Sequence, residues 1–485
     1  MAKKTTNKTA KRRIERDSMG EMAVPAHVLY GASTQRAVLN FPISGRPVPP
    51  PVIGAFAHLK RACAEANLEL KKLDAKRGRL IIRACDEIIA GCADDASRAE
   101  WMEHFPIDIF QTGSGTSSNM NANEVISNLA CRYAGRNIGA KDPVHPNDHV
   151  NMGQSSNDTF PTAMQVAGAV LIREELIPSM KHLAGALRAK ARQWDRIVKI
   201  GRTHLMDATP IRVGQEFSGF AAQAAYAVDR ARHAMAVMAE NLPIGGTAVG
   251  TGINTHPRFG ALVCRKLSKA LGVKFTEAPN HYEAQATRDC IVEASGELKT
   301  IAVSLSKIAN DIRWLGSGPR CGLFELSLPA TQPGSSIMPG KVNPVICESV
   351  MMVACQVIGN DAAITLGAAG GIGSLMQLNV AMPMMADNLI ESITILAHAA
   401  VMFADKCIKE LKVNKAIATG MVEKSLMMCT SLAPEIGYDN AAKVAKGAFA
   451  SGQTVREYVL EHKLIEPRRL DELLEPRSMT EPSGR

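Results

Sequence analysis

The sequence predicts a mostly α-helical fold organised around a central bundle of long helices, and two observations lead to this prediction. The 485 residues are 46% hydrophobic but only 4% aromatic, so the interior must be built from Ala, Leu, Ile, Val and Met, which favours packed helices over a β-sandwich. Long stretches with few helix breakers fill the middle of the chain, most clearly residues 217–241 and 291–315. Helices of about 25 residues reach about 40 Å, a length typical of an extended bundle.

Three domains are predicted along the chain, as its length allows. Residues 1–150 mix short extended pieces and Pro-rich turns, such as PVPPP at 47–51, with helical segments such as 53–73. Residues 151–407 carry the long helices, and residues 408–485 are typical of shorter helices joined by polar turns. In the second long helix, residues at spacings of three and four share one apolar face, namely Leu298, Ile301, Leu305, Ile308, Ile312 and Leu315.

The positive charge of the chain is concentrated at its N-terminus. Of a formal net charge of +9, the first sixteen residues account for +6, with seven Lys or Arg and one Glu. We predict that residues 1–12 form a disordered, solvated basic tail and not a nucleic-acid-binding arm, because no aromatic residue is interleaved to stack on bases. We expect no membrane partner either, since no apolar run reaches about 18 residues without a charge or a helix breaker.

The eleven cysteines are scattered, with no C-x-x-C pair. This spacing favours buried free thiols in a reducing compartment over a metal site. We therefore expect a cytoplasmic protein with no metal and no cofactor.

Two polar segments in the first third of the chain suit carboxylate binding. TGSGTSSNMNANE at residues 112–124 contains Ser114, Gly115 and Thr116 in a turn that enters a helix, and helix N-termini offer unpaired N–H groups to anions. Simple helix capping is the competing interpretation. HPNDHVN at 145–151 and QSSND at 154–158 offer donors for a second carboxylate.

Two further segments carry groups suited to proton transfer. GRTHLMDATP at 201–210 places His204 beside Thr203, and the near-neutral pKa of histidine suits acid–base work, although an isolated histidine is more often structural. GSSIMPGKVNP at 334–344 is punctuated by glycine and proline and precedes a helix. This loop combines hydroxyl, ammonium and amide groups, which favours a functional site over a merely flexible loop. Its relevant residues are Ser335, Ser336, Lys341, Val342 and Asn343, followed by Glu348 in the helix.

Residues 334–343 match the signature loop of the fumarase/aspartase superfamily, whose members add or eliminate across a fumaryl unit. The other three polar segments resemble the remaining active-site regions of this superfamily in the same order, and the similarity extends from residue 13 to about residue 475. The resemblance implies the superfamily's three-domain, mostly α fold. Residues 1–150 then correspond to the N-terminal lyase domain, 151–407 to the helical bundle and 408–485 to the small C-terminal domain.

Within the superfamily, four positions resemble class II fumarases more than aspartases. The GRTH sequence carries His204 where typical aspartases have Gln, and QSSND, GTGINTH at 250–256 and MPGK at 338–341 agree. The implied activity is the reversible hydration of fumarate to (S)-malate in the tricarboxylic acid cycle, without a metal or cofactor. Aspartate ammonia-lyase is the alternative enzyme. A non-enzymatic structural protein, or a nucleic-acid binder acting through residues 1–16, is the alternative of another class.

The resemblance also implies a role for each site residue. Ser335 is the base, and Lys341 and Asn343 stabilise the negative charge that develops on the carboxylate. His204, polarised by Glu348, protonates the departing hydroxyl through a bound water or, in hydration, activates that water. The substrate carboxylates are bound by Ser114, Gly115, Thr116, Ser155, Ser156, Asn157, Thr203, Ser336, Lys341, Val342 and Asn343. A secondary dicarboxylate site is implied at His145, Pro146, Asn147 and Asp148, although the preceding KDPV turn lacks the family's arginine. The partners implied are copies of the same chain, in a homotetramer whose active sites are shared between three subunits.

Overall fold

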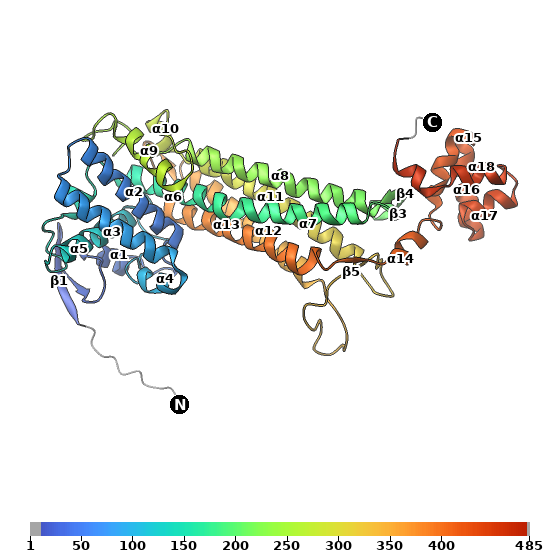
Figure 1. Cartoon of the computed structure of the whole chain (residues 1–485), viewed down its shortest axis with the longest axis horizontal. Coiled ribbons are helices and arrows are strands. Elements are labelled where there is room, and N and C mark those ends of the chain that lie inside the picture. Colours follow the sequence, from blue (N-terminus) through green and yellow to red (C-terminus); the bar gives the residue numbers. More distant parts are fainter. Residues whose placement is uncertain (1–10, 483–485) are drawn as a thin grey trace. The chain divides into compact units, whose positions relative to one another are not determined.

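A computed structural model describes residues 11–482, which form a mostly helical chain (Figure 1). They group into two compact units. Within the described residues, unit 1 comprises 11–177, Arg230–Thr300 and Gln356–Leu396, and unit 2 comprises Pro178–Asp229, Ile301–Cys355 and 397–482. The predicted mostly α-helical fold is confirmed. The division into domains at residues 150 and 407 stays a prediction.

Unit 1 is built on helix α2, which packs against α3, α6 and α9. The rings of Phe56 on α2 and Phe160 on α6 meet edge to face with their centroids 5.7 Å apart, a favourable aromatic geometry. The elements of this unit are β1 (Arg12–Asp17), β2 (Gly20–Pro25), α1 (Ala32–Asn40), α2 (Pro50–Glu69), α3 (Ala75–Ala93), α4 (Asp95–Met102), α5 (Thr116–Tyr133), the π-helical turns η1 (Pro146–Val150) and η2 (Ile172–Leu176), α6 (Ser156–Leu171), α9 (Phe259–Leu271), α10 (His281–Ala286), β6 (Ser374–Leu375) and β7 (Leu378–Asn379).

The PVPPP segment is not simply a turn, as the sequence suggested. Pro49 caps α2, and Pro50 and Pro51 are the first residues of the helix. Proline is tolerated there because the first N–H groups of a helix have no partner within it. The predicted helix at 53–73 therefore begins earlier, at Pro50, and ends at Glu69.

Unit 2 contains two short antiparallel strand pairs, β3 with β4 and β5 with β8. Its C-terminal helices enclose a small apolar core that includes Val444, Val459 and Leu470. The elements are α7 (Ile177–Gln193), β3 (Val198–Thr203), β4 (Met206–Arg212), β5 (Leu326–Ser327), the π-helical turn η3 (Ala404–Ile408), β8 (Lys412–Val413), α14 (Lys415–Gly420), the 3-10 helices η4 (Leu426–Leu432) and η5 (Pro476–Thr480), α15 (Ala433–Ile436), α16 (Tyr438–Ser451), α17 (Val455–Glu461) and α18 (Pro467–Leu473).

Four long helices contribute residues to both units: α8 (Val213–Ala239), α11 (Asp289–Leu315), α12 (Val345–Ala368) and α13 (Met382–Phe403). They include the two helices predicted at residues 217–241 and 291–315, which are confirmed. All six residues of the predicted apolar face of α11 are at most 6% exposed. That face therefore belongs to the core, as the spacing indicated.

The basic N-terminal segment is partly folded. Most of the predicted tail, residues 1–10, lies outside the described residues, but Arg12 already pairs in β1. The guanidinium of Arg13 donates to the carbonyls of Pro25 and Val28, each at 2.7 Å, and of Tyr30 at 2.6 Å. Since these bonds occupy Arg13, it is not free to bind a phosphate backbone.

All eleven cysteines are free thiols, and eight of them are buried. The expectation of burial is wrong for Cys321 and Cys355, which are exposed, while Cys290 is intermediate.

Two segments of the described chain, Val345–Ala368 and Met382–Ile408, are long and apolar enough to pass a length-and-composition test for membrane spans. Each carries acidic residues, among them Glu348 and Asp387. Core helices of soluble proteins pass the same test, and 39% and 56% of the two tested windows are buried inside the fold.

Candidate active site

Three of the predicted carboxylate-binding hydroxyls form a chain in unit 1. Ser114 Oγ lies 2.8 Å from Thr116 Oγ1, which in turn lies 2.7 Å from Ser156 Oγ. Thr116 is the first residue of α5 and Ser156 the first residue of α6. The fold therefore brings two helix N-termini together, and both carry partial positive charge.

Gly115 fixes the turn into α5. Its φ of 71° lies in the left-handed region, and a Cβ at this position would lie 2.0 Å from Cδ2 of Phe160. Only glycine meets both conditions. Gly115 caps α5 without a side-chain cap bond, so the neighbouring hydroxyls are not consumed by capping and face one another.

The remaining predicted groups of this region have structural partners. Ser155 is the cap residue of α6, where its Oγ accepts from the N–H of Asn157 at 3.2 Å and Asp158 completes a capping box. The side-chain amide of Asn157 donates to the carbonyl of Ala248 at 2.8 Å. Ser155 thus serves as a helix cap, whereas the capping interpretation made for residues 112–124 does not hold for Ser114 or Thr116.

Sequence reasoning missed a buried cation behind these hydroxyls. Lys60 on α2 is 0% exposed, and its Nζ donates to Asn119 Oδ1 at 2.7 Å, Asn151 Oδ1 at 3.0 Å and Gln154 Oε1 at 2.9 Å. The available signal was the spacing, which puts Lys60 on an apolar helical face, four residues after Phe56 and three before Cys63. Lysine is almost never fully buried unless it is paired.

The implied secondary dicarboxylate site lies on η1. His145 caps this turn, and its Nδ1 accepts from the N–H groups of Asn147 and Asp148 at 3.3 and 3.2 Å. Pro146 is buried, whereas Asn147 and Asp148 are exposed. The imidazole of His145 is engaged in capping. Of the four residues of the implied secondary site, Asn147 and Asp148 are therefore the ones with exposed polar groups.

In unit 2, His204 and Leu205 form the two-residue turn between β3 and β4. Thr203 pairs with Met206 across it, and the φ angles of His204 and Leu205 are 56° and 62°. Two-residue hairpin turns of this kind favour Asn and Gly, and side chains other than those are strained there by about 1–3 kcal/mol each. The turn is exposed from Thr203 to Asp207. The strained backbone therefore carries a solvent-exposed His204.

A buried group of charges supports this hairpin. Glu325, which precedes β5, lies 2.7 Å from Nη2 of Arg202 and 2.8 Å from Nζ of Lys199, and Lys199 also lies 3.0 Å from Glu216. Glu325 and Lys199 are each 2% exposed. Arg202, the residue before Thr203, is thus bound to the segment that leads into the 334–343 loop.

The loop itself carries Ser335 in a specific environment. Ser335 Oγ accepts from the backbone N–H of Met338 at 3.0 Å and of Ile337 at 3.3 Å. Two donors on one hydroxyl oxygen favour its ionised form.

The ends of the loop are joined by a backbone bond from Gly334 N–H to the carbonyl of Lys341 at 2.9 Å. Asn343 adds a side-chain bond to the carbonyl of Gly334 at 2.5 Å. A Cβ at residue 334 would lie 2.2 Å from the carbonyl oxygen of Lys341, so the closure requires glycine.

A cavity of about 430 Å³ lies along the loop, with Ser335, Lys341 and Val342 among its lining residues. Ser336, Lys341 and Val342 are exposed, as is Glu348 in the first turn of α12. Among residues 11–482, no hydrogen bond or ion pair joins His204 to Glu348. The pairing of these two residues within one chain is therefore absent, and the role of Glu348 stays a prediction.

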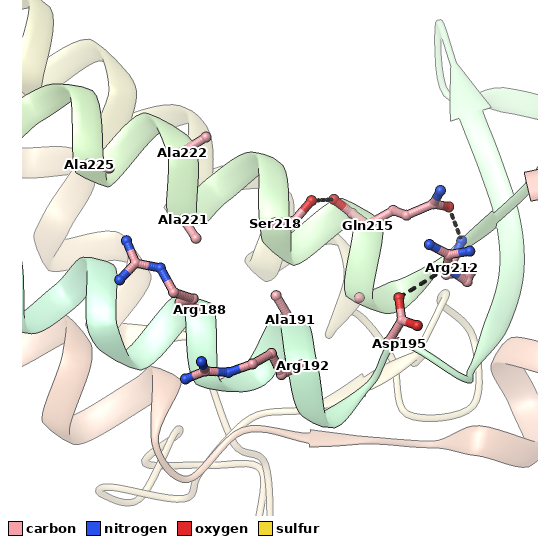
Figure 2. Close-up of a pocket in the computed structure, with 11 residues that line it drawn as sticks. Arg188, Ala191, Arg192, Asp195, Arg212, Gln215, Ser218, Ala221, Ala222 and Ala225 are labelled. Carbon is pink, nitrogen blue, oxygen red and sulfur yellow. Dashed lines mark hydrogen bonds and ion pairs between the residues drawn. The ribbon is translucent and has the colours of Figure 1, made fainter. Parts of the chain in front are cut away.

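A groove that the sequence did not predict lies between α7 and α8 in unit 2 (Figure 2). It has a volume of about 740 Å³, and Arg188 and Arg192 line it from α7. Arg212 at one end is already paired, with Asp195 at 3.1 Å and with Glu481. The groove contains none of the predicted site residues.

Comparison with known proteins places the chain among lyases. A family model described as "Lyase" matches residues 20–359, and one described as "Fumarase C C-terminus" matches residues 428–481. The chain is 50% identical over 453 residues to a class II fumarate hydratase of Thermosynechococcus vestitus, covering 93% of this chain and 94% of that protein. It is 48% identical over 472 residues to the mitochondrial fumarate hydratase of Homo sapiens, covering 97% and 90%.

Among solved structures, the chain is similar to a recombinant class II fumarase from Schistosoma mansoni. The TM-score is 0.92 at 38% sequence identity, and the match covers 97% of this chain and 99% of that one. The likeness thus extends over both units and includes all four polar segments.

Proposed function

The chain belongs to the class II fumarate hydratase family, and from this premise we propose that it catalyses the reversible addition of water to fumarate to give (S)-malate, a step of the tricarboxylic acid cycle. It is then a carbon–oxygen lyase that acts on a small dicarboxylate. The observation that carries the proposal is the environment of Ser335, whose oxygen accepts two backbone N–H bonds.

The difficult step in the dehydration direction is removal of the C3 proton of malate. The carbon acid is weak, and the resulting carbanion places a second negative charge on the neighbouring carboxylate. Ser335 Oγ takes this proton as an alkoxide. The N–H groups of Ile337 and Met338 stabilise that alkoxide, and exclusion of water by the loop strengthens their effect.

Lys341 and Asn343 lie on the same closed loop and hold the charge that develops on the carboxylate. Asn343 is anchored by its bond to Gly334, and Lys341 is exposed and lies near Ser335 in the sequence. The ammonium of Lys341 and the amide of Asn343 stabilise the charge that develops on the carboxylate. This stabilisation is stronger in the transition state than in the bound substrate, where that charge is smaller.

His204 handles the oxygen. In dehydration the departing hydroxyl leaves C2 as water after receiving a proton through a water bound to His204, and in hydration the histidine activates that water instead. Glu348 polarises His204. The strained, exposed turn supports this role, because strain retained at an exposed histidine is typical of functional positions.

The substrate carboxylates bind to groups of the four polar segments. Ser114, Thr116 and Ser156 form one hydroxyl chain, and Gly115 sets its geometry. Ser155, Asn157, Thr203, Ser336 and Val342 complete the binding surface that we propose. No metal or cofactor takes part in this scheme.

We also propose that the protein is a homotetramer whose active sites are shared between three subunits. Large apolar side chains remain exposed on the long helices, including Met352 at 66% and Leu366 at 58% on α12 and Tyr226 at 59% on α8. Large apolar side chains left exposed on long helices favour burial against other subunits. The absence of a His204–Glu348 contact within the described chain agrees with the sharing of residues between copies.

Mixing two impaired variants tests this sharing. If each site combines Ser335 and His204 from different chains, co-expressed Ser335→Ala and His204→Asn chains form some sites that carry neither substitution, and part of the activity returns. Tetramers that show no recovery, or a fully active monomer on dilution, would contradict the proposal.

The activity itself is tested by incubating the purified protein with fumarate, with and without ammonium, and identifying the product. Malate formed without ammonium supports the hydratase. Aspartate formed only with ammonium would instead establish the ammonia-lyase activity of the related aspartases.

For location we propose the cytoplasm. The relative from Homo sapiens carries the word mitochondrial in its name, so the compartment varies among relatives. Cell fractionation with an antibody against the chain decides between the two compartments.

A further inference from the structure

Lys60 is a fully buried ammonium whose hydrogen-bonding capacity is completely used. Its three N–H groups meet the side-chain oxygens of Asn119, Asn151 and Gln154 at 2.7–3.0 Å, and an ammonium has only three donors. All three acceptors are neutral amides. No ion pair among the described residues includes Lys60, so its charge is solvated by dipoles and is not cancelled by a bonded carboxylate.

The buried acid of this region does not neutralise Lys60 by direct contact. Asp158 is 0% exposed and accepts from the backbone N–H groups of Ser155 at 2.9 Å, Thr247 at 2.9 Å and Gly245 at 3.2 Å. Its hydrogen bonds are directed to the backbone. A burial that served stability alone would be achieved at lower cost by an apolar side chain, because removing an ammonium from water is unfavourable.

The amides that surround Lys60 belong to the segments that carry the hydroxyl chain. Asn119 lies on α5 just after Thr116, and Gln154 directly precedes Ser155 and Ser156. Two further hydrogen bonds connect the residues around Lys60: Thr159 Oγ1 donates to Asn119 Oδ1 at 3.0 Å, and Asn119 Nδ2 donates to Asn151 Oδ1 at 3.2 Å. The ammonium therefore sits behind the point where Thr116 and Ser156 meet.

We propose that Lys60 is a positioning residue for a substrate carboxylate: it fixes the N-termini of α5 and α6 through Asn119 and Gln154, and its positive charge, which is hydrogen-bonded to no carboxylate among the described residues, strengthens the attraction of this cluster for a dicarboxylate. This inference rests on the proposed function, since the dicarboxylate is the substrate assigned there. The long-range effect arises because charges interact strongly where water is excluded.

A purely structural role is the competing explanation, and titration separates the two. Burial lowers the pKa of Lys60 to about 8, while the thiols of Cys63 on α2 and Cys85 on α3 and the carboxyl of Asp158 on α6 act in the opposite direction. A bound dianion favours the charged ammonium, so binding near pH 8 takes up protons. Above that pH the ammonium loses its charge and the affinity for the dicarboxylate falls.

The first experiment compares steady-state kinetics with fumarate for the full-length protein and two variants. Lys60→Gln keeps donors for the amide cage but removes the charge, and we expect KM to rise about tenfold with a smaller change in kcat. Arg61→Met is the matched control, because Arg61 is the next residue of α2 and, among the described residues, forms ion pairs only with Glu65 and Asp86, at 2.9 and 2.8 Å. The control should leave KM unchanged. An unchanged KM in folded Lys60→Gln would overturn the proposal.

The second experiment measures proton uptake and does not depend on turnover. Succinate, a non-reacting four-carbon dicarboxylate, is titrated into the protein near pH 8 by calorimetry in buffers of different ionisation enthalpy. We expect uptake in the unmodified protein and its loss in Lys60→Gln, which a structural role would not produce. If the variant fails to fold, the unmodified protein decides: succinate affinity that does not fall above about pH 8 overturns the proposal. Succinate binding with this signature but without malate formation would refute the hydratase proposal alone.

Discussion

Nη2 of Arg202 lies 2.7 Å from Oε1 of Glu325, in surroundings where Glu325 is only 2% exposed. This ion pair joins the hairpin of His204 to the segment that precedes the Ser335 loop. Two predicted catalytic residues that lie far apart in the sequence therefore rest on one buried contact within unit 2.

Replacement of Arg202 by Met should destabilise unit 2 by about 3 kcal/mol, because removing one partner of a buried pair leaves the other charge poorly compensated. Lys199, 2.8 Å from Glu325, limits the loss. The measurement is urea unfolding followed by circular dichroism. Arg16→Met serves as the control, since its pair with Glu21 is exposed and should contribute at most about 1 kcal/mol. Equal losses in the two variants would show that the buried pair has no special role.

Ser335→Ala should lower kcat by about a thousandfold or more while the fold stays intact, because it removes the proposed base. Ser336→Ala should mainly raise KM, since Ser336 is assigned only a binding contact. Fumarate hydration rates and far-ultraviolet circular dichroism of both variants test this pair of expectations. A Ser335→Ala enzyme with normal turnover would require another base.

His204→Asn should separate activity from stability. Turnover should fall by about a hundredfold, the usual contribution of a general acid–base group. The free energy of unfolding should rise slightly, by about 0.5–1 kcal/mol, because Asn tolerates the positive φ of this turn better than histidine does. Kinetics and urea unfolding on the same preparation provide both values. A variant that loses stability would show that the turn is not strained.

Asp158 should make stability fall as the pH rises from about 4 to about 7. Burial raises its pKa to about 7, and this outweighs the backbone N–H bonds that favour ionisation. A carboxyl with a raised folded-state pKa contributes stability that is complete below its unfolded-state value and is lost as pH passes the folded-state value. Unfolding free energies across this range should therefore decline in the unmodified protein and be flatter in Asp158→Asn. Parallel pH profiles would refute the assignment.

The sequence predicted features that depend on local pattern. The apolar face of α11 follows from a spacing of three and four, and the Ser335 loop is contiguous, so its residues could be named together. Lys60 could not be placed, because its three acceptors come from three other positions and the burial of an ammonium is decided by packing. The positive φ angles of His204 and Leu205 could not be predicted from the sequence either, since neither residue type is typical of a hairpin turn. The distribution of the site residues over two units also depends on tertiary structure, which no single segment encodes.

The bond between Gly334 N–H and the carbonyl of Lys341 turns the loop into a closed ring of backbone. A ring moves as one body, whereas an open loop would let its two arms drift independently. The proposed base Ser335 and the proposed charge-binding Lys341 therefore lie on one closed ring, and a side chain at residue 334, which would meet the carbonyl of Lys341, would open that ring without altering either of their side chains.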